Sequence, residues 1–199
     1  GLVYSDAFNF NEKGKEKRKF EIHKPYRGNI FSELLLCNFI STQTAVIRRE
    51  AFDSMDRWFD GRLIQTGDYD AYLRISYRWK VDYVDKPLAR YRVHRNSQTW
   101  SDGRKLLSVE LDLVIENLRQ NVCGFEDKYP EGARSLKRLR DVQLSLLDWE
   151  NGDKREARKK INVYIRDGVS YLILSLLMYF PYRYVYYTCH RMYTKNIIA

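Results

Sequence analysis

The sequence predicts an α/β portion followed by an α-helical region. Short apolar segments of strand length alternate with helix-like segments as far as Val93. Near Ser97 the composition changes, and from there on apolar residues recur at helical spacing. The chain of 199 residues is 44% hydrophobic, which is enough for one substantial core or two smaller ones.

The first part of the chain contains five segments in order. Leu2–Ser5 is predicted to form a short buried strand, and the polar, basic segment 9–19 to form a solvated loop. Ile30–Cys37 packs apolar residues densely enough for a buried helix. Thr42–Ile47 alternates like a strand, and Ile47–Met55 is predicted to be a short helix.

A longer helix is predicted to begin at Asp68, because aspartate is a favourable N-cap residue. Its apolar residues recur at helical spacing as far as Trp79. Two short strands, Val81–Val84 and Leu88–Val93, then flank the turn-forming sequence DKP at 85–87. These elements complete the α/β portion.

The second half is predicted to be helical. Three amphipathic helices are expected, over Leu107–Leu118, Leu136–Leu146 and Ala157–Tyr164. The sequence Asn151-Gly152-Asp153 separates the last two. Together they resemble one helical hairpin of the tetratricopeptide kind, and a single hairpin is not a repeat array.

The C-terminal segment 168–199 is apolar and aromatic. Its first 15 residues, Gly168–Tyr182, carry no charge, whereas a membrane-spanning helix needs about 20 apolar residues. An aromatic and basic flank typical of lipid headgroup level accompanies it, formed by Tyr179, Tyr182, Tyr184, Tyr186 and Tyr187 and then His190, Arg191 and Lys195. Two alternatives stay open: a core helix that closes the domain, or a helix at a membrane interface.

Charge and cysteine content exclude several classes of function. Thirty-five Lys and Arg against 26 Asp and Glu give a net charge of +9, spread evenly along the chain. Such a surplus suits phosphates or an anionic membrane surface, but no groove-reading motif accompanies it, so no nucleic-acid partner is predicted. Cys37, Cys123 and Cys189 lack the spacing of a zinc site or disulfide framework. Without a visible secretory signal, the expected location is cytoplasmic.

Six segments in a fixed order carry a resemblance to a known family. They are Gly28–Phe31 (GNIF), Asn38–Ile40 (NFI), Thr44–Glu50 (TAVIRRE), Trp58–Asp60 (WFD), Gly67–Arg74 (GDYDAYLR) and Lys86–His94 (KPLARYRVH). Their order and spacing resemble the family 2 glycosyltransferases of the GT-A fold. The resemblance implies that residues 1–98 are the C-terminal, acceptor-side half of such a domain. Residues 99–167 would then be a helical extension, and 168–199 the C-terminal helix.

The resemblance also implies a catalytic base. An inverting sugar transfer needs a base that takes the proton of the acceptor hydroxyl while the nucleotide leaves from the opposite face. Asp68 matches the family's catalytic aspartate, although Gly67 stands where an acidic residue is common. Asp70 is the competing candidate, and residues two apart on a helix do not share a face. The alternative role of Asp68 is a plain N-cap.

Further site residues follow from the same resemblance. Arg92 and His94 share a strand face and would bind the donor diphosphate, with His94 as a ligand of a divalent metal, Mn²⁺ or Mg²⁺. Trp58 and Asp60, with Asp70, are candidates on the acceptor side. The family's metal-binding DxD motif has no match in the sequence, since Asp68-Tyr69-Asp70 corresponds to the later motif.

The function implied is that of a glycosyltransferase fragment. The parent enzyme would move one sugar from a nucleotide-diphospho-sugar to a hydroxyl of a glycan or lipid-linked acceptor, with inversion. It would be non-processive, because the QxxRW motif of polysaccharide synthases is absent, and would serve cell-surface polysaccharide or lipopolysaccharide synthesis. Without its donor half this chain is expected to be inactive. It could lie on the cytoplasmic face of the inner membrane through residues 168–199. The alternative is a non-catalytic basic module that binds a membrane or a partner.

Overall fold

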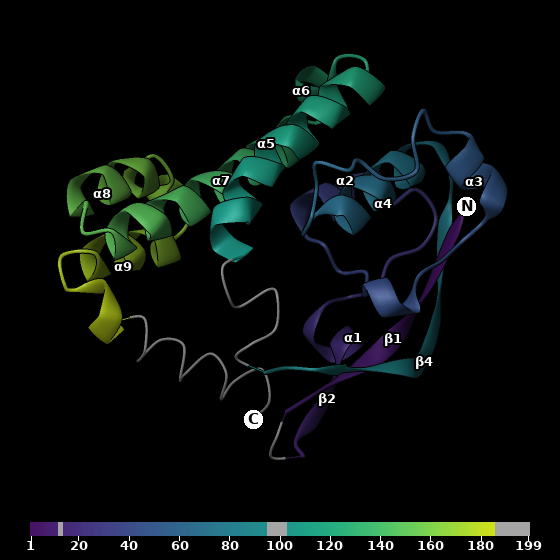
Figure 1. The fold of residues 1–199 in the computed structure, drawn as a ribbon, viewed down its shortest axis with the longest axis horizontal. Coiled ribbons are helices and arrows are strands. Elements are labelled where there is room, and N and C mark those ends of the chain that lie inside the picture. Colours follow the sequence, from purple (N-terminus) through teal and green to yellow (C-terminus); the bar gives the residue numbers. More distant parts are fainter. Residues whose placement is uncertain (12–13, 95–102, 186–199) are drawn as a thin grey trace.

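The protein has a mixed α/β structure, as predicted. The computed structural model describes residues 1–11, 14–94 and 103–185. A small sheet with short helices forms one end, and long helices lead away from it to the helices at the other end (Figure 1). The tyrosines and basic residues predicted to flank the C-terminal helix from Tyr186 onwards lie outside the described residues.

The sheet is built around β1 (Leu2–Phe10). On one edge β1 pairs in parallel with β4 (Val81–Arg92) along its whole length. On the other edge it pairs antiparallel with β2 (Glu16–Arg18) near its end and with β3 (Val46–Ile47) near its start. The result is a four-stranded mixed sheet.

The predicted loop at 9–19 is wrong at both ends, because residues 9–10 and 16–18 belong to this sheet. β1 continues to Phe10, and β2 returns beside it after a tight turn. The turn is stabilised by Gly14, whose φ of 75° suits glycine, and by the Asn11 side chain, which accepts a hydrogen bond from the Lys15 amide. Polar composition therefore marked the region between two strands and a short, partly exposed strand, not a loop throughout.

The two strands predicted around residues 85–87 are one strand, β4. The register with β1 shifts on both sides of Asp6, so that Asp6 is paired with Pro87. Asp85 and Lys86 form an irregularity inside a continuous strand and do not reverse the chain. Because β4 lies at an edge of the described sheet, the missing amide of Pro87 breaks no ladder on its outer side.

Helices cover the sheet in the first part of the chain. They are α1 (Lys19–Ile22), α2 (Phe31–Leu36), the 3-10 helix η1 (Thr42–Thr44), α3 (Arg49–Asp53) and α4 (Gly67–Arg78). The strand predicted over Thr42–Ile47 is thus mostly a 3-10 turn, with only its last two residues in β3. The N-cap of α4 is Thr66, not Asp68, which lies in the first turn.

The second part is helical, as predicted. Its elements are α5 (Gly103–Asn121), α6 (Phe125–Lys128), α7 (Pro130–Glu150), α8 (Lys154–Asn162), η2 (Ile165–Asp167) and α9 (Val169–Leu177). The predicted break between α7 and α8 is confirmed. Gly152 adopts a φ of 92° there, and the Asp153 carboxylate caps α8 by accepting from the Glu156 amide at 3.0 Å.

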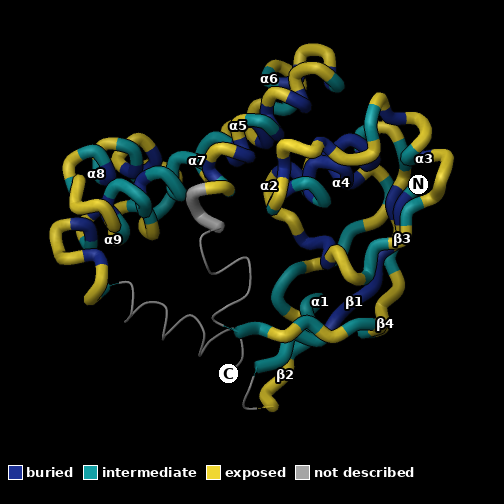
Figure 2. The backbone as a smooth tube through the Cα atoms, viewed as in Figure 1, coloured by how far each residue is buried: buried dark blue, intermediate teal, exposed yellow. Residues whose placement is uncertain are grey.

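Two hydrophobic clusters hold the described chain together (Figure 2). The larger combines the inner face of β1 and helices α2 and α4 with α5, α6 and the start of α7; its fully buried members include Leu2, Tyr4, Leu34, Leu73, Leu111, Leu118 and Leu136. This cluster contains residues from both sides of position 98, the predicted boundary between the α/β portion and the helical extension. Within it, α7 approaches α2 so closely that a Cβ at Gly132 would lie 2.5 Å from Leu35 Cδ1.

The smaller cluster lies at the other end of α7. It combines Trp149 with Ala157 and Ile161 of α8 and with Met178 and Tyr182 beyond α9. The indole nitrogen of Trp149 donates to the Phe180 carbonyl at 2.9 Å, which ties α7 to the segment after α9. Among the described helices, none combines the length and apolar character needed to cross a bilayer.

Candidate active site at the start of helix α4

The start of α4 is organised by a carboxylate from another helix. Glu110 of α5 is buried, and its oxygens accept hydrogen bonds from the amides of Ile64, Gln65 and Thr66 and from the Thr66 hydroxyl at 2.8–3.1 Å. A negative charge at this position is favoured by the helix dipole. Glu110 therefore satisfies the amides of the loop residues that lead into the helix, whereas the first-turn amide of Tyr69 is bound by Asp68.

Asp68 lies in the first turn of α4 and is only half-buried. One of its carboxylate oxygens accepts from the Tyr69 amide at 2.7 Å, and the other accepts from the Thr42 hydroxyl of η1. Both bonds fix the orientation of the carboxylate without covering it. The side chain is thus positioned by two separate elements, which is what a general base requires.

Asp70 and Asp60 are buried, and both carboxylates are bound by an arginine and by an asparagine. The guanidinium of Arg74 binds the Asp70 carboxylate at 2.7 Å, and that of Arg62 binds the Asp60 carboxylate at 2.7 Å. The amide nitrogen of Asn117 on α5 donates to both carboxylates, at 2.9 Å and 3.1 Å. The hydrogen bond from Arg62 holds the pKa of Asp60 well below its usual range. This network holds the loop before α4 against α5.

Lys19, which lies near Asp68, and two residues near Lys19, His23 and Cys37, were not among the predicted site residues. Lys19 begins α1, His23 ends it, and Cys37 follows α2; the sulfur of Cys37 lies 3.8 Å from His23 Nδ1. Burial lowers the pKa of Lys19, while the nearby Cys37, Asp68 and Asp6 side chains act in the opposite direction. Burial, followed by the charge of Lys19, lowers the pKa of His23. Their positions depend on the hairpin, which the polar composition of 9–19 did not reveal.

Tyr72 adds a further hydroxyl to the surroundings of Asp68. It lies one turn further along α4, and burial raises its pKa to about 12, with a smaller contribution from the Asp68 charge in the same direction. Its ring is buried, so its role at this place is to pack. Asp68, Lys19 and His23 are each half-buried.

Arg92 and His94 lie at the far end of β4. Arg92 pairs with Phe10 in the sheet, four to five residues beyond the Asp6–Pro87 pair, which corresponds to about 15 Å along the strand. Within the described part of the chain, no hydrogen bond or ion pair joins either residue to Asp68. Nor do three His, Cys, Asp or Glu side chains gather anywhere in that part to hold a metal ion.

Trp58 forms an exposed aromatic surface beside α3. Its ring stacks on Phe52 with centroids 5.1 Å apart, and the Arg49 guanidinium lies 4.4 Å from its ring centre. Its carbonyl accepts from Arg74, six residues along α4 from Asp68, or about 9 Å of helix. Trp58 is thus tied to the middle of α4 through Arg74 and not to Asp68 at its start.

Comparisons of the chain with models of protein families, with curated proteins and with solved structures found no match.

Proposed function

We propose that this chain is the acceptor-side part of a nucleotide-sugar glycosyltransferase of the GT-A type, with Asp68 as its catalytic base. The proposal rests on the resemblance of the six motif segments, on the mixed α/β architecture, and on the environment of Asp68. It also places the chain in the cytoplasm, where nucleotide-sugars would be available to it.

The observation that carries the proposal is the contrast among three carboxylates. The motif segments Trp58–Asp60 and Gly67–Arg74 contain Asp60, Asp68 and Asp70. Two of these are buried and bound by arginines, with side-chain exposures of 5% for Asp60 and 1% for Asp70. Asp68 alone of the three is open to a ligand. A buried, ion-paired carboxylate cannot approach an acceptor hydroxyl, so Asp68 is the one suited to proton transfer.

The chemistry proposed for this place is a single inverting displacement. The acceptor hydroxyl oxygen forms a bond to the anomeric carbon of the donor sugar, and the bond from that carbon to the nucleotide diphosphate breaks on the opposite face. The proton of the hydroxyl passes to the Asp68 carboxylate. The Thr42 hydroxyl and the Tyr69 amide hold that carboxylate in place during the transfer.

Arg92 and His94 are proposed to contact the donor diphosphate at the end of β4. Arginine suits phosphate oxygens, and the family uses a divalent metal, Mn²⁺ or Mg²⁺, to neutralise the leaving diphosphate. The described residues do not form a metal site by themselves, since no three His, Cys, Asp or Glu side chains gather among them. We therefore assign no step to a metal, and the contribution of this chain is limited to the acceptor and the proton.

The test is the variant Asp68→Asn in the protein that carries this sequence, with transfer from a panel of nucleotide-diphospho-sugars as the measurement. Loss of a general base should lower the turnover rate about a hundredfold or more, while donor binding changes little. The matched control is Asp127→Asn, which removes an exposed carboxylate on α6. Transfer that survives Asp68→Asn at the control rate would remove Asp68 from the role.

The alternative function, a non-catalytic module that binds a membrane or a partner, is favoured by a different observation. Helix α9 exposes an apolar face next to the basic helix α8. The surface that this creates does not depend on sugar transfer.

A further inference from the structure

Helix α9 is apolar on the face it buries and also on the face it exposes. Val169, Leu172, Ile173 and Leu176 have exposed fractions between 42% and 72% and lie at helical spacing along one stripe. The opposite face packs into the smaller hydrophobic cluster. Tyr179 and Phe180 continue the stripe directly after the helix and are also exposed. A contiguous apolar stripe of this kind marks an interaction site.

The neighbouring helix α8 is strongly basic. Its nine residues include five Lys or Arg and one Glu. Lys160 is ion-paired with Asp148, and Lys159 lies 3.8 Å from Glu156. For Lys154, Arg155 and Arg158, no carboxylate of the described residues lies within ion-pair distance. This part of the surface therefore carries uncompensated positive charge.

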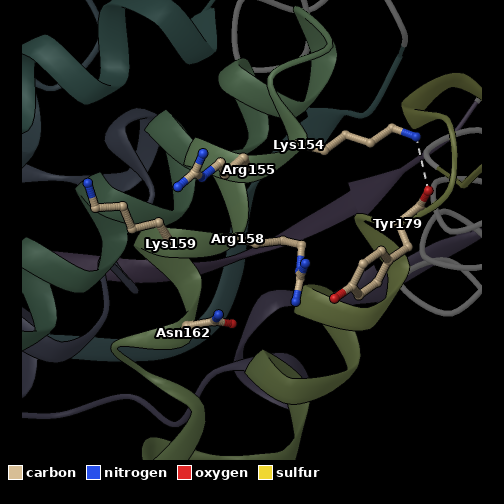
Figure 3. Close-up of a pocket in the computed structure, with 6 residues that line it drawn as sticks. All are labelled: Lys154, Arg155, Arg158, Lys159, Asn162 and Tyr179. Carbon is tan, nitrogen blue, oxygen red and sulfur yellow. Dashed lines mark hydrogen bonds between the residues drawn. The ribbon is translucent and has the colours of Figure 1, made fainter.

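A pocket lies between the basic helix α8 and Tyr179, which follows α9 (Figure 3). It has a volume of about 590 Å³ and is lined by Lys154, Arg155, Arg158, Lys159, Asn162 and Tyr179. The Arg158 guanidinium lies 3.7 Å from the centre of the Tyr179 ring, and Lys154 Nζ donates to the Tyr179 carbonyl at 2.9 Å. Arg158 Nε is buried and has no hydrogen-bond partner among the described residues.

We propose that α8 and α9 form a docking surface for a bilayer that contains anionic lipids. The stripe defined by Val169, Leu172, Ile173 and Leu176 would enter the boundary between headgroups and acyl chains. The pocket would receive a headgroup phosphate, which would compensate the charges of Lys154, Arg155 and Arg158 in its lining. Tyr179 belongs to both the stripe and the pocket, so the two parts engage the same surface together.

Charge complementarity selects this occupant. An apolar partner protein or a second copy of this chain would bury the stripe, but a second copy would bring the same excess of positive charge to the contact. An anionic bilayer provides apolar depth and negative charge side by side, and amphipathic helices with basic neighbours bind it through both. Tyrosine and arginine at the junction suit the headgroup level.

The experiment is flotation of the full chain with vesicles, which needs no catalytic activity. Mixed vesicles of phosphatidylglycerol and phosphatidylcholine should carry the protein upward, and phosphatidylcholine vesicles should not. The double variant Leu172→Gln with Leu176→Gln should lower partitioning about tenfold or more, because two exposed leucines no longer enter the bilayer. The double variant Arg155→Gln with Lys159→Gln should lower it about fivefold per charge removed.

Matched controls use residues exposed elsewhere. Val109→Gln with Leu139→Gln removes two exposed apolar side chains of α5 and α7, and Lys24→Gln with Lys128→Gln removes two exposed lysines. Both controls should float like the unaltered chain. Circular dichroism should show the same helix content for all four double variants, the two tests and the two controls. Three results would overturn the proposal: no flotation of the unaltered chain, equal flotation of the stripe variant, or equal binding to both vesicle types. A dimer that the stripe variant converts to a monomer, without vesicle binding, would assign the stripe to a second copy.

Discussion

The two ends of the molecule treat charged and apolar groups in opposite ways. At the sheet end, the carboxylates of Asp60, Asp70 and Glu110 are buried, and each has nitrogen or hydroxyl partners. At the α8–α9 end, leucines lie exposed beside basic residues without a carboxylate partner. The first arrangement forms a rigid frame around Asp68, and the second leaves an apolar and basic surface exposed to solvent. We therefore propose proton transfer at the sheet end and membrane attachment at the α8–α9 end.

The largest expected effect breaks the frame at its buried ion pair. Asp70→Ala leaves the Arg74 guanidinium, whose side chain is 2% exposed, without its carboxylate. Removing one partner of a buried pair should lower the free energy of unfolding by about 4 kcal/mol, measured by urea denaturation. The control Asp127→Ala, at an exposed site, should change it by less than about 0.5 kcal/mol. A small effect at Asp70 would mean that the frame is not held by this pair.

A pair of identical substitutions compares the two ends directly. Leu118 in α5 is 1% exposed, so Leu118→Ala should leave a cavity and lower the free energy of unfolding by about 3 kcal/mol. Leu172→Ala in α9 alters a side chain that is 42% exposed and should cost less than about 1 kcal/mol. Equal costs in urea denaturation would contradict the contrast, since they would require the stripe on α9 to be packed.

The close contact between α7 and α2 predicts whether the substitution Gly132→Ala stabilises or destabilises the protein. Alanine is normally favoured over glycine in a helix by about 1 kcal/mol. At Gly132, however, the new Cβ would lie 2.8 Å from Leu35 Cβ, so one of the two helices must shift. Gly132→Ala should therefore lower the thermal midpoint, with a cost of about 2 kcal/mol. A rise of the midpoint would show that the larger cluster does not pack α7 against α2 this closely.

The smallest expected effect is a difference in pH dependence. The hydrogen bond from Arg62 lowers the pKa of Asp60 in the folded state, so Asp60 adds stability above the unfolded value of about 4. That contribution is lost as the pH falls from there towards the folded pKa. Between about pH 4 and pH 2, the unaltered chain should lose more stability than Asp60→Asn in urea denaturation. Parallel curves would contradict the role given to the Arg62 bond.

The helices of the second half were predictable because amphipathic periodicity is local. The break at Gly152 and the cap at Asp153 follow from the same short-range signals. The sheet was harder, because β2 is also held by ion pairs with β4, Arg18 with Asp85 and Glu16 with Arg90, which are distant in sequence. Pro87 is a turn former in isolation, yet the pairing with β1 extends β4 through it.

The candidate site was predictable only in part. Asp68 and its neighbour Asp70 were identified by resemblance, but their different burial depends on Asn117, which lies 47 residues away from Asp70. The Glu110 carboxylate that serves the start of α4 is equally distant in sequence. Lys19 lies near Asp68 only because the hairpin places α1 there. Such contacts leave no periodic signal in the sequence.

We propose that proton transfer takes place at the sheet end of the molecule and membrane attachment at the α8–α9 end. This proposal is tested most directly by the rate of sugar transfer to a soluble acceptor in the protein that carries this sequence, measured for Asp68→Asn and for Leu172→Gln with Leu176→Gln. The account predicts that Asp68→Asn lowers the rate about a hundredfold or more, while the α9 variant keeps it. Full transfer by Asp68→Asn, or its loss in the α9 variant, would contradict the account.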